Sequence, residues 1–421
     1  MARASTGRRR GVGSRIGWPL KIFVGALLVV LILLILNAFA LNNETKSASI
    51  NVDGARLVNT TSGQLQVLDT GSPVKNGVIK APEFAKEGLD PGTPRSMATM
   101  ASLKKAADTP IVLIHGSAGA INWWDDLIPL LEPYHRVIAI DMLGYGGSEK
   151  PDSGYSIENQ ANLVAQVLGR LDVQEAILVG HSLGGKVVTS VAEQTPELVS
   201  GLVLIDTAPD NSFGGLSGGA RATRTPILGQ ALWRVAPDSV IRKNVEQGFA
   251  PGFDVPDKYV EDVREMTYPA YKDSAVEGEQ FTEQQSLPDR LAAVGKPLLV
   301  IFGEEDQIYD AREALSAYAA IPGADTLLIP DSGHSPQVEA PEKTAAAIES
   351  FAYGIARKSV EKTFSRQIAE QKARQTKKRA RAAAKRKANQ VRKKAGNRTG
   401  SRSQSASNRA NQSKQEAGQG N

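Results

Sequence analysis

The most reactive side chain that the sequence offers is the hydroxyl of Ser182, which stands within residues 180–185 (GHSLGG). An apolar run (AILV) precedes this motif and a helical pattern follows it, so we predict a sharp turn from a strand into a helix. Glycines two residues before and two after the serine permit the strained backbone of such a turn. The turn would expose the hydroxyl at the carboxyl edge of a sheet, beside a helix N-terminus that favours negative charge. The alternative is a glycine-rich turn with a structural role only.

A serine hydroxyl is a weak nucleophile and needs a base that a third group holds in place. His334 follows the last predicted strand, in the segment DSGHSP, and Asp306 follows the strand LLVIFG. We therefore expect both at the sheet edge of Ser182, in the chain order Ser, Asp, His. Asp206, which ends the strand LVLI, and Glu305 compete with Asp306 for the role of the acid. The alternative for the histidine is an ordinary surface loop.

A tetrahedral intermediate needs two N–H donors for its oxyanion. We expect the amide of Leu183, directly after the nucleophile, and the amide of Ser117, in the loop HGSAG after the first core strand. The side chains of His115 and His181 are interpreted as structural. With four histidines and no cysteine in the chain, these assignments leave no ligand cluster for zinc, and we predict neither a metal nor a cofactor.

Alternating strands and helices must position these side chains. Six short runs rich in Val, Ile and Leu are predicted as strands that are buried on both faces. Their alternation with helical patterns predicts an α/β fold, with a mostly parallel central sheet flanked by helices. A hairpin around Ser62 and Gly63 precedes them. The predicted strands are Ile111–Ile114, Val137–Ile140, Ala176–Val179, Leu202–Ile205, Leu298–Phe302 and Thr326–Ile329, and the predicted helices are Ile157–Leu171, Leu183–Gln194, Ala311–Ala320 and Pro341–Ala356.

Two stretches interrupt the alternation. Residues 72–108 contain four prolines and several glycines and are predicted as an irregular insertion. Residues 208–290 separate two predicted strands and combine a glycine-rich start with acidic helical patterns. So long a gap within a compact sheet protein is typical of a cap subdomain. The apolar and aromatic side chains of this cap would either pack its own core or line an acyl pocket.

Residues 54–355 resemble the α/β-hydrolase fold family in the order of their landmarks, HGSAG, DMLGYGGS, GHSLGG, FGEEDQ and DSGHSPQVEAPE. The resemblance implies a serine nucleophile, an acid after a late strand, a histidine near the end and a helical cap inserted after the sixth strand. These roles fall on Ser182, Asp306, His334 and residues 208–290. Relatives of this fold that are dehalogenases or epoxide hydrolases carry Asp at the elbow, and prolyl aminopeptidases carry Trp after the serine, so neither pattern fits.

The resemblance and the motif together predict a serine hydrolase of the esterase or lipase-like kind, which cleaves carboxylic esters through an acyl-enzyme. Two alternatives stay open. The same triad could serve an acyltransferase or a carbon–carbon bond hydrolase, or the chain could be a catalytically silent member of the fold that only binds. We expect the site to take a small acyl substrate, which could be a lipid-like ester.

The N-terminus predicts a membrane segment. Residues 22–41 are uncharged over a length that spans the ~30 Å hydrocarbon core of a bilayer. Residues 1–21 hold six basic side chains and no acid, so the positive-inside rule predicts a cytoplasmic N-terminus and an exported catalytic domain, joined by a linker at 42–53. The competing prediction is a signal sequence cleaved after Ala40, which would make the domain secreted.

The charge of the chain is segregated. The formal net charge is +5, but residues 355–421 carry +17 and residues 22–354 carry −18. The segment 356–421 is rich in Lys, Arg, Ala, Gln and Ser and is predicted as a disordered tail or a fraying helix. Anionic lipid or an anionic cell-wall polymer is its expected partner, because export makes nucleic acid an unlikely one. The alternative is a solubilising role or attraction to the acidic body.

Overall fold

The computed structural model describes residues 18–73, 80, 82, 94–215 and 222–416. The chain divides into two compact units, Met1–Arg357 and Lys358–Asn421. Most of the predicted basic segment 1–21 and part of the predicted insertion 72–108 lie outside the described residues.

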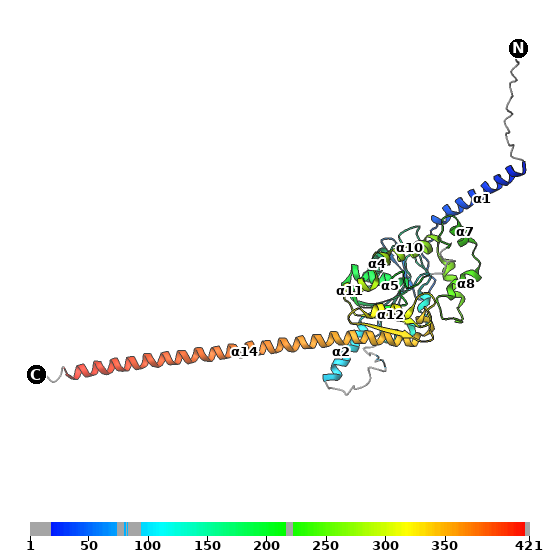
Figure 1. Cartoon of the computed structure of the whole chain (residues 1–421). Coiled ribbons are helices and arrows are strands. Elements are labelled where there is room, and N and C mark those ends of the chain that lie inside the picture. Colours follow the sequence, from blue (N-terminus) through cyan, green and yellow to red (C-terminus); the bar gives the residue numbers. More distant parts are fainter. Residues whose placement is uncertain (1–17, 74–79, 81, 83–93, 216–221, 417–421) are drawn as a thin grey trace, which may run out of the picture. The chain divides into compact units, whose positions relative to one another are not determined.

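An eight-stranded sheet forms the centre of the first unit, in the order β1-β2-β4-β3-β5-β6-β7-β8 (Figure 1). The hairpin of β1 and β2 is antiparallel and joins β4 in antiparallel fashion, whereas all other neighbours in the sheet are parallel. The predicted fold class, a mostly parallel α/β sheet, is therefore confirmed. The strands are β1 Arg56–Thr60, β2 Gly63–Asp69, β3 Ile111–Ile114, β4 Val137–Ile140, β5 Ala176–His181, β6 Val199–Ile205, β7 Leu298–Gly303 and β8 Ala324–Ile329.

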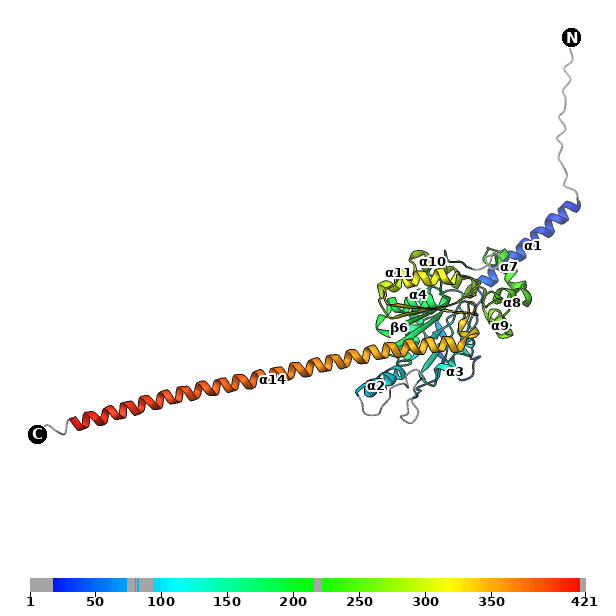
Figure 2. The ribbon, with the colours of Figure 1, turned by 60° about the horizontal axis from the view of Figure 1, so that its bottom comes forward.

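Each face of the sheet packs against helices because alternate side chains of the buried strands point to opposite faces. In β3, Val112 and Ile114 belong to the cluster that includes α4 (Ile157–Arg170), α5 (Leu183–Gln194) and α12 (Ala311–Ala319). Ile111 and Leu113 belong to the cluster on the other face. That second cluster includes side chains from η2 (Ile121–Trp124), α3 (Ile128–Leu131) and the start of α14 (Pro341–Glu416). Figure 2 shows α4 and α14 separated by the sheet.

The described part of the long excursion after β6 contains five named helices. They are α7 (Leu228–Val235), α8 (Asp238–Glu246), α9 (Asp257–Glu265), α10 (Tyr268–Gln284) and α11 (Leu287–Val294), the last of which leads into β7. Helix α11 contacts α5 and places Leu287 and Leu291 in the core of the body. The backbone N–H of Leu287 donates to the carbonyl of Pro209 over 2.9 Å, so the chain leaves and re-enters the body at neighbouring points. The short helices elsewhere are η3 (Pro196–Leu198) and α13 (Pro336–Glu339).

The second half of the predicted irregular insertion is a helix, α2 (Pro94–Asp108). Leu103, Ala106 and Ala107 of this helix are buried. The prolines and glycines that predict irregular chain lie mostly before residue 94, whereas the residues after it are mostly good helix formers such as Ala, Met, Leu and Lys. The expectation of irregular structure over all of 72–108 is corrected accordingly.

Helix α1 (Trp18–Asn42) covers the predicted membrane segment 22–41. Among the described residues it is the one helix long and apolar enough to cross a membrane. Most of its side chains are exposed, but Ala38 and Leu41 in its last turns are buried, and the helix contacts α7 and α10.

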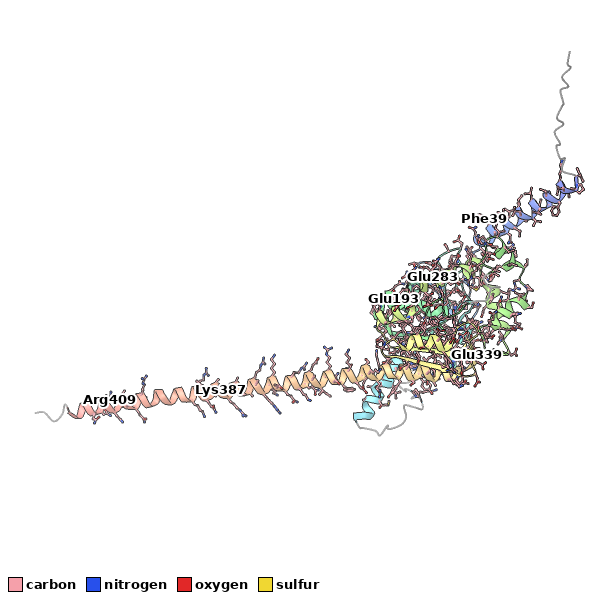
Figure 3. All side chains as sticks on the ribbon, viewed as in Figure 1. Phe39, Glu193, Glu283, Glu339, Lys387 and Arg409 are labelled. Carbon is pink, nitrogen blue, oxygen red and sulfur yellow. The ribbon has the colours of Figure 1, made fainter. Side chains whose placement is uncertain are left out.

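The second unit is helical where it is described. Helix α14 continues through Glu416, and the described side chains from residue 361 onward are exposed. Figure 3 shows Lys387 and Arg409 extending from this helix. A helix is one of the two forms expected for this segment, and Ala, Lys, Arg and Gln favour it even where no apolar face packs.

Candidate active site

Ser182 stands at a strained turn between β5 and α5. Its backbone has φ 50° and ψ −113°, a conformation that L-residues adopt rarely and at a cost. The flanking glycines leave no space for a side chain. A Cβ on Gly180 would lie 2.4 Å from the carbonyl oxygen of Gly184, and a Cβ on Gly184 would lie 2.2 Å from that of Ile114. The strain is therefore maintained by tight backbone packing under the serine.

Asp306 and His334 are joined by a hydrogen bond of 2.8 Å between Oδ2 of the carboxylate and Nδ1 of the imidazole. The other oxygen of Asp306 accepts from the backbone N–H groups of Ile308 and Tyr309. Burial alone would raise the pKa of Asp306, but the imidazole and these hydrogen bonds hold the pKa below its ordinary value. The carboxylate stays ionised and fixes the imidazole with Nε2 free to act on a proton.

Asp206 lies beside this pair and does not replace Asp306 as the partner of the imidazole. Its Oδ1 accepts from the backbone N–H of Gly303 over 3.0 Å. Burial, followed by the charge of Asp306, raises the pKa of Asp206 well above its ordinary value, so its carboxyl takes up a proton more readily than that of Asp306. Glu305, the other candidate acid, is exposed. Asp206, Asp306 and His334 offer ligand atoms within 4.8 Å of one another, but the hydrogen bonds above already engage those of Asp306 and His334.

The loop with the predicted oxyanion donor packs directly on the elbow. A Cβ on Gly116 would lie 2.7 Å from Nδ1 of His181 and 3.1 Å from the Cβ of Ser182, so Ser117 is brought beside the nucleophile. Ser117 and Leu183 both line the same cavity as Ser182 and His334. Both residues thus lie at the cavity to which their amides are expected to donate.

The two other histidines near the site hold its loops. Nδ1 of His115 donates to the carbonyl of Gly116 over 2.8 Å, while its Nε2 accepts from the backbone N–H of Met142 over 3.0 Å. Burial lowers its pKa and keeps it neutral. His181 donates from Nε2 to the carbonyl of His334 over 2.8 Å, and burial lowers its pKa to about 3.

Two residues of the site were not predicted from the sequence. The carboxylate of Glu339 accepts from the backbone N–H groups of Gly333, Ser335 and Ala250, and so ties the histidine loop to the cap. Tyr309 packs edge-on against the ring of His334 at 5.3 Å, and its hydroxyl interacts with Ser182. Glu339 stands within the segment DSGHSPQVEAPE, but only the folded loop shows which amides a single carboxylate reaches.

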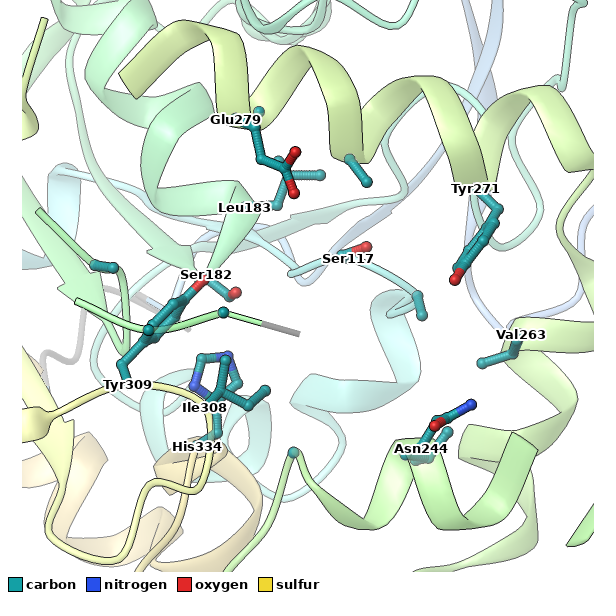
Figure 4. A pocket seen from close by; sticks show the side chains of 18 of the residues that line it. Ser117, Ser182, Leu183, Asn244, Val263, Tyr271, Glu279, Ile308, Tyr309 and His334 are labelled. Carbon is teal, nitrogen blue, oxygen red and sulfur yellow. The ribbon is translucent and has the colours of Figure 1, made fainter. Parts of the chain in front are cut away.

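A cavity of about 450 Å³ opens over Ser182. Figure 4 shows Ser182, Tyr309 and His334 on one side of it, with Tyr271 and Val263 of the cap on the other. Trp233 of α7 stacks on Tyr271 with 4.4 Å between ring centres and also lines the cavity. The remaining apolar lining from the cap includes Ala236, Val240, Ile241, Val245 and Ala275.

A model of the alpha/beta hydrolase family matches residues 111–347, a span that contains the elbow, the acid and the histidine. The chain belongs to the alpha/beta hydrolase family. The family resemblance predicted from the ordered motifs is thus confirmed.

Proteins similar to this hydrolase include enzymes of different specificity. The "2-hydroxy-6-oxo-6-(2'-aminophenyl)hexa-2,4-dienoic acid hydrolase" of Metapseudomonas resinovorans is 29% identical over 59% of this chain and 86% of its own length. The uncharacterized hydrolase YugF of Bacillus subtilis is 28% identical over 57% of this chain and 89% of its own. Among solved structures, a thermophilic esterase from Thermogutta terrifontis matches with a TM-score of 0.53 and 22% identity, over 72% of this chain and 99% of the esterase. The last likeness is one of fold.

Proposed function

We propose that this α/β hydrolase is a serine esterase that cleaves carboxylic esters through an acyl-enzyme. His334 takes the proton of Ser182 as the oxygen attacks the ester carbonyl, and the amides of Ser117 and Leu183 bind the oxyanion. His334 then passes the proton to the leaving alcohol. Water, deprotonated by the same imidazole, releases the acid and restores Ser182, while Asp306 holds the imidazole and stabilises its charged form.

The observation that carries this proposal is the hydrogen-bonded pair of His334 and Asp306 facing the same cavity as the strained Ser182. The lining favours a neutral substrate. Lys186 donates to the carbonyl of Gly278 over 2.8 Å, and Arg224 forms an ion pair with Glu279 at 2.6 Å. The cations in the described lining are thus already engaged by the protein, which suits an uncharged ester better than an anionic substrate.

The test combines active-site labelling with turnover. A fluorophosphonate probe should label the full chain at Ser182, and p-nitrophenyl esters should be hydrolysed. Ser182→Ala should abolish labelling and reduce kcat by about 10⁴-fold or more. Ser153→Ala, at an exposed serine, is the control and should behave like the parent chain. Labelling that persists in Ser182→Ala would refute the assignment of the nucleophile.

A second candidate reaction is carbon–carbon bond hydrolysis or acyl transfer with the same triad. The dienoic acid hydrolase of Metapseudomonas resinovorans, 29% identical, favours keeping the first of these. Offering an alcohol acceptor together with an ester substrate separates transfer from hydrolysis, because transfer yields a new ester. Turnover of a dienoic keto-acid in preference to every p-nitrophenyl ester would replace the ester proposal with the carbon–carbon one.

We further propose that α1 remains uncleaved as an anchor, with the N-terminus cytoplasmic and the hydrolase domain exported. The burial of Ala38 and the contacts of α1 with α7 and α10 support retention, because cleavage after Ala40 would remove Ala38 and leave only Leu41 and Asn42 of the helix. N-terminal sequencing of the mature protein tests retention. Protease added outside intact cells tests the topology, since it should digest the basic segment 356–421.

The exposed basic helix after Lys358 is proposed to bind anionic lipid or an anionic cell-wall polymer. Its described side chains are exposed from residue 361 onward, and its charged side chains are predominantly cationic, which suits an extended polyanionic surface. Binding of the full chain to vesicles with and without phosphatidylglycerol, repeated at increasing salt, tests this proposal. Vesicle binding that depends on neither lipid charge nor salt would contradict the proposal.

A further inference from the structure

Helix α7 presents apolar side chains to solvent on one face. Leu228, Leu232 and Val235 stand four and seven residues apart along the helix and are 58%, 37% and 72% exposed. The other face of the same helix is covered, because Gln230 is buried and Trp233 packs on Tyr271 inside the cavity. The helix is therefore amphipathic, with its apolar stripe turned away from the body of the protein.

The same helix is held against the carboxyl end of α1. The amide of Gln230 donates to the side-chain oxygen of Asn42 over 3.0 Å, and Ala38 and Leu41 are buried in the last turns of α1. A second hydrogen bond joins Glu44 to the backbone N–H of Tyr268 over 3.2 Å. The cap is thus connected to the end of the apolar helix through the side chains of Asn42 and Glu44.

The length of α1 sets the depth of this junction in a bilayer. Its 25 residues extend over ~37 Å, which exceeds the ~30 Å hydrocarbon core and leaves the last turns at the headgroup level. Because α7 contacts those turns, its exposed stripe lies at the boundary between headgroups and acyl chains. Arg234, exposed on α7, suits the same boundary, where interfacial helices carry basic side chains.

One exposed apolar side chain close to this stripe in the chain also belongs to the cavity. Val240, just after α7, is 49% exposed and also lines the cavity, so it marks a point where the lining reaches the outside. Ile227, directly before α7, is 36% exposed and extends the apolar surface at the other end. An acyl chain that leaves the bilayer here would pass along Val240 and Trp233 toward Ser182 without crossing water.

We propose that the apolar stripe of α7, with Ile227 and Val240, docks on the bilayer that holds α1, and that the cavity takes acyl esters directly from that bilayer. The docking rests on the proposed anchoring by α1, and the substrate class deepens the proposed ester hydrolysis. The two parts are tested separately below.

Docking is measured on the full chain, which has no native cysteine to interfere with labelling. A single cysteine is introduced as Val235→Cys, labelled with an environment-sensitive fluorophore and reconstituted in nanodiscs of phosphatidylcholine and phosphatidylglycerol. Met100→Cys, on α2 and 45% exposed, is the matched control. Lipids with a nitroxide near the headgroup should quench the label at position 235 and not at position 100, and aqueous iodide should do the reverse.

The labelling result decides the docking whether or not the enzyme turns over. Equal quenching of both positions by iodide, with none from the nitroxide lipid, would overturn the proposal. Mass spectrometry of the reconstituted chain verifies that α1 is present. Loss of α1 during biosynthesis would overturn the proposal too, because the junction at residue 42 would then be absent.

The substrate route is measured with Leu228→Asp and Val235→Asp in the full chain. Neither residue lines the cavity, so hydrolysis of soluble p-nitrophenyl acetate should match the parent chain. Hydrolysis of a long-chain ester embedded in the same nanodiscs should fall by about tenfold, the factor expected when a leucine-sized contact with the bilayer is lost. Equal rates on the embedded ester would refute the route. If the parent chain hydrolysed neither ester, the result would instead count against the proposed esterase function.

Discussion

The body and the cap form opposite walls of the cavity and are held by different interactions. On the side of the body, the position of Ser182 depends on backbone packed against backbone, as the space around Gly180 and Gly184 shows. On the side of the cap, aromatic rings stack on one another, including Trp233 on Tyr271 and, nearby, Phe249 on Phe253 at 5.0 Å. Contacts of the first kind tolerate almost no displacement, whereas stacked rings can slide or be exchanged.

This difference implies a division of roles. The body should determine whether the reaction occurs at all, because an oxyanion or a base displaced by 1 Å loses much of its effect. The cap should determine which acyl group is accepted. We therefore expect substitutions in the body and in the cap to have effects of different kind and of different size.

The largest expected effect concerns the acid on the side of the body. Asp306→Asn should lower kcat by about 10⁴-fold, because the imidazole loses its ionised partner. Asp206→Asn should cost less than about tenfold, since the raised pKa of Asp206 favours the neutral carboxyl, which a neutral amide can replace. Steady-state rates on one soluble ester measure both. If Asp206→Asn proved as damaging as Asp306→Asn, the assignment of the acid would have to change.

The next effect compares two glycines across the cavity. A Cβ at Gly184 would meet backbone at 2.2 Å, so Gly184→Ala should destabilise the fold by about 3 kcal/mol. A Cβ at Gly278 of α10 would meet only the movable side chain of Leu183 at 2.7 Å. The helix-forming tendency of alanine offsets that crowding, so Gly278→Ala should stay within about 1 kcal/mol of the parent. Urea unfolding measures the stability of both variants. Similar losses of stability would contradict the difference between body and cap.

A smaller effect is expected from the stacked aromatic side chains of the cap. Trp233→Ala should raise KM for long-chain p-nitrophenyl esters by about tenfold, because a large apolar contact is lost. The kcat for the acetate, which is too short to reach the cap, should change less than about twofold. A uniform decrease for all chain lengths would show that Trp233 supports the body rather than selecting the substrate.

The last effect concerns stability instead of catalysis and tests the link between the two walls. Asp262 of α9 accepts from Asn122 and from Nε1 of Trp123, each over 3.0 Å, and burial raises its pKa to about 7. The folded state thus binds a proton more tightly than the unfolded state, so stability is lost as the pH rises from about 4 through 7. Asp262→Asn should reduce this loss by roughly 2 kcal/mol between pH 5 and 8. Asp53→Asn, at an exposed carboxylate, should leave the pH profile unchanged.

Much of the body could be predicted from the sequence because buried parallel strands are short, apolar and followed by loops at one edge. The predicted runs Ile111–Ile114 and Val137–Ile140 coincide with β3 and β4, and Leu183–Gln194 coincides with α5. The chain order of Ser182, Asp306 and His334 also predicts that they meet, and the structure places Ser182 and His334 at one cavity, with Asp306 hydrogen-bonded to His334. Their catalytic roles remain the proposal made above.

Other features depend on contacts that no local pattern encodes. The role of Glu339 follows from two loops that meet around one carboxylate, and the raised pKa of Asp206 follows from its burial and then from the charge of Asp306 beside it. For the basic segment after residue 356, which lacks an apolar face, the sequence left both disorder and a fraying helix open. The structure has a helix there and at α2, in line with the helix propensity of both segments.

The hydrogen bond between Pro209 and Leu287 has a consequence for how the enzyme could change over evolutionary time. The segment between these residues starts and finishes at one spot, while α11 by itself completes a standard crossover from β6 to β7. The whole segment can therefore be exchanged, lengthened or deleted during evolution, while the residues around Ser182 keep their positions. Such an architecture allows substrate specificity to vary while the reaction stays the same.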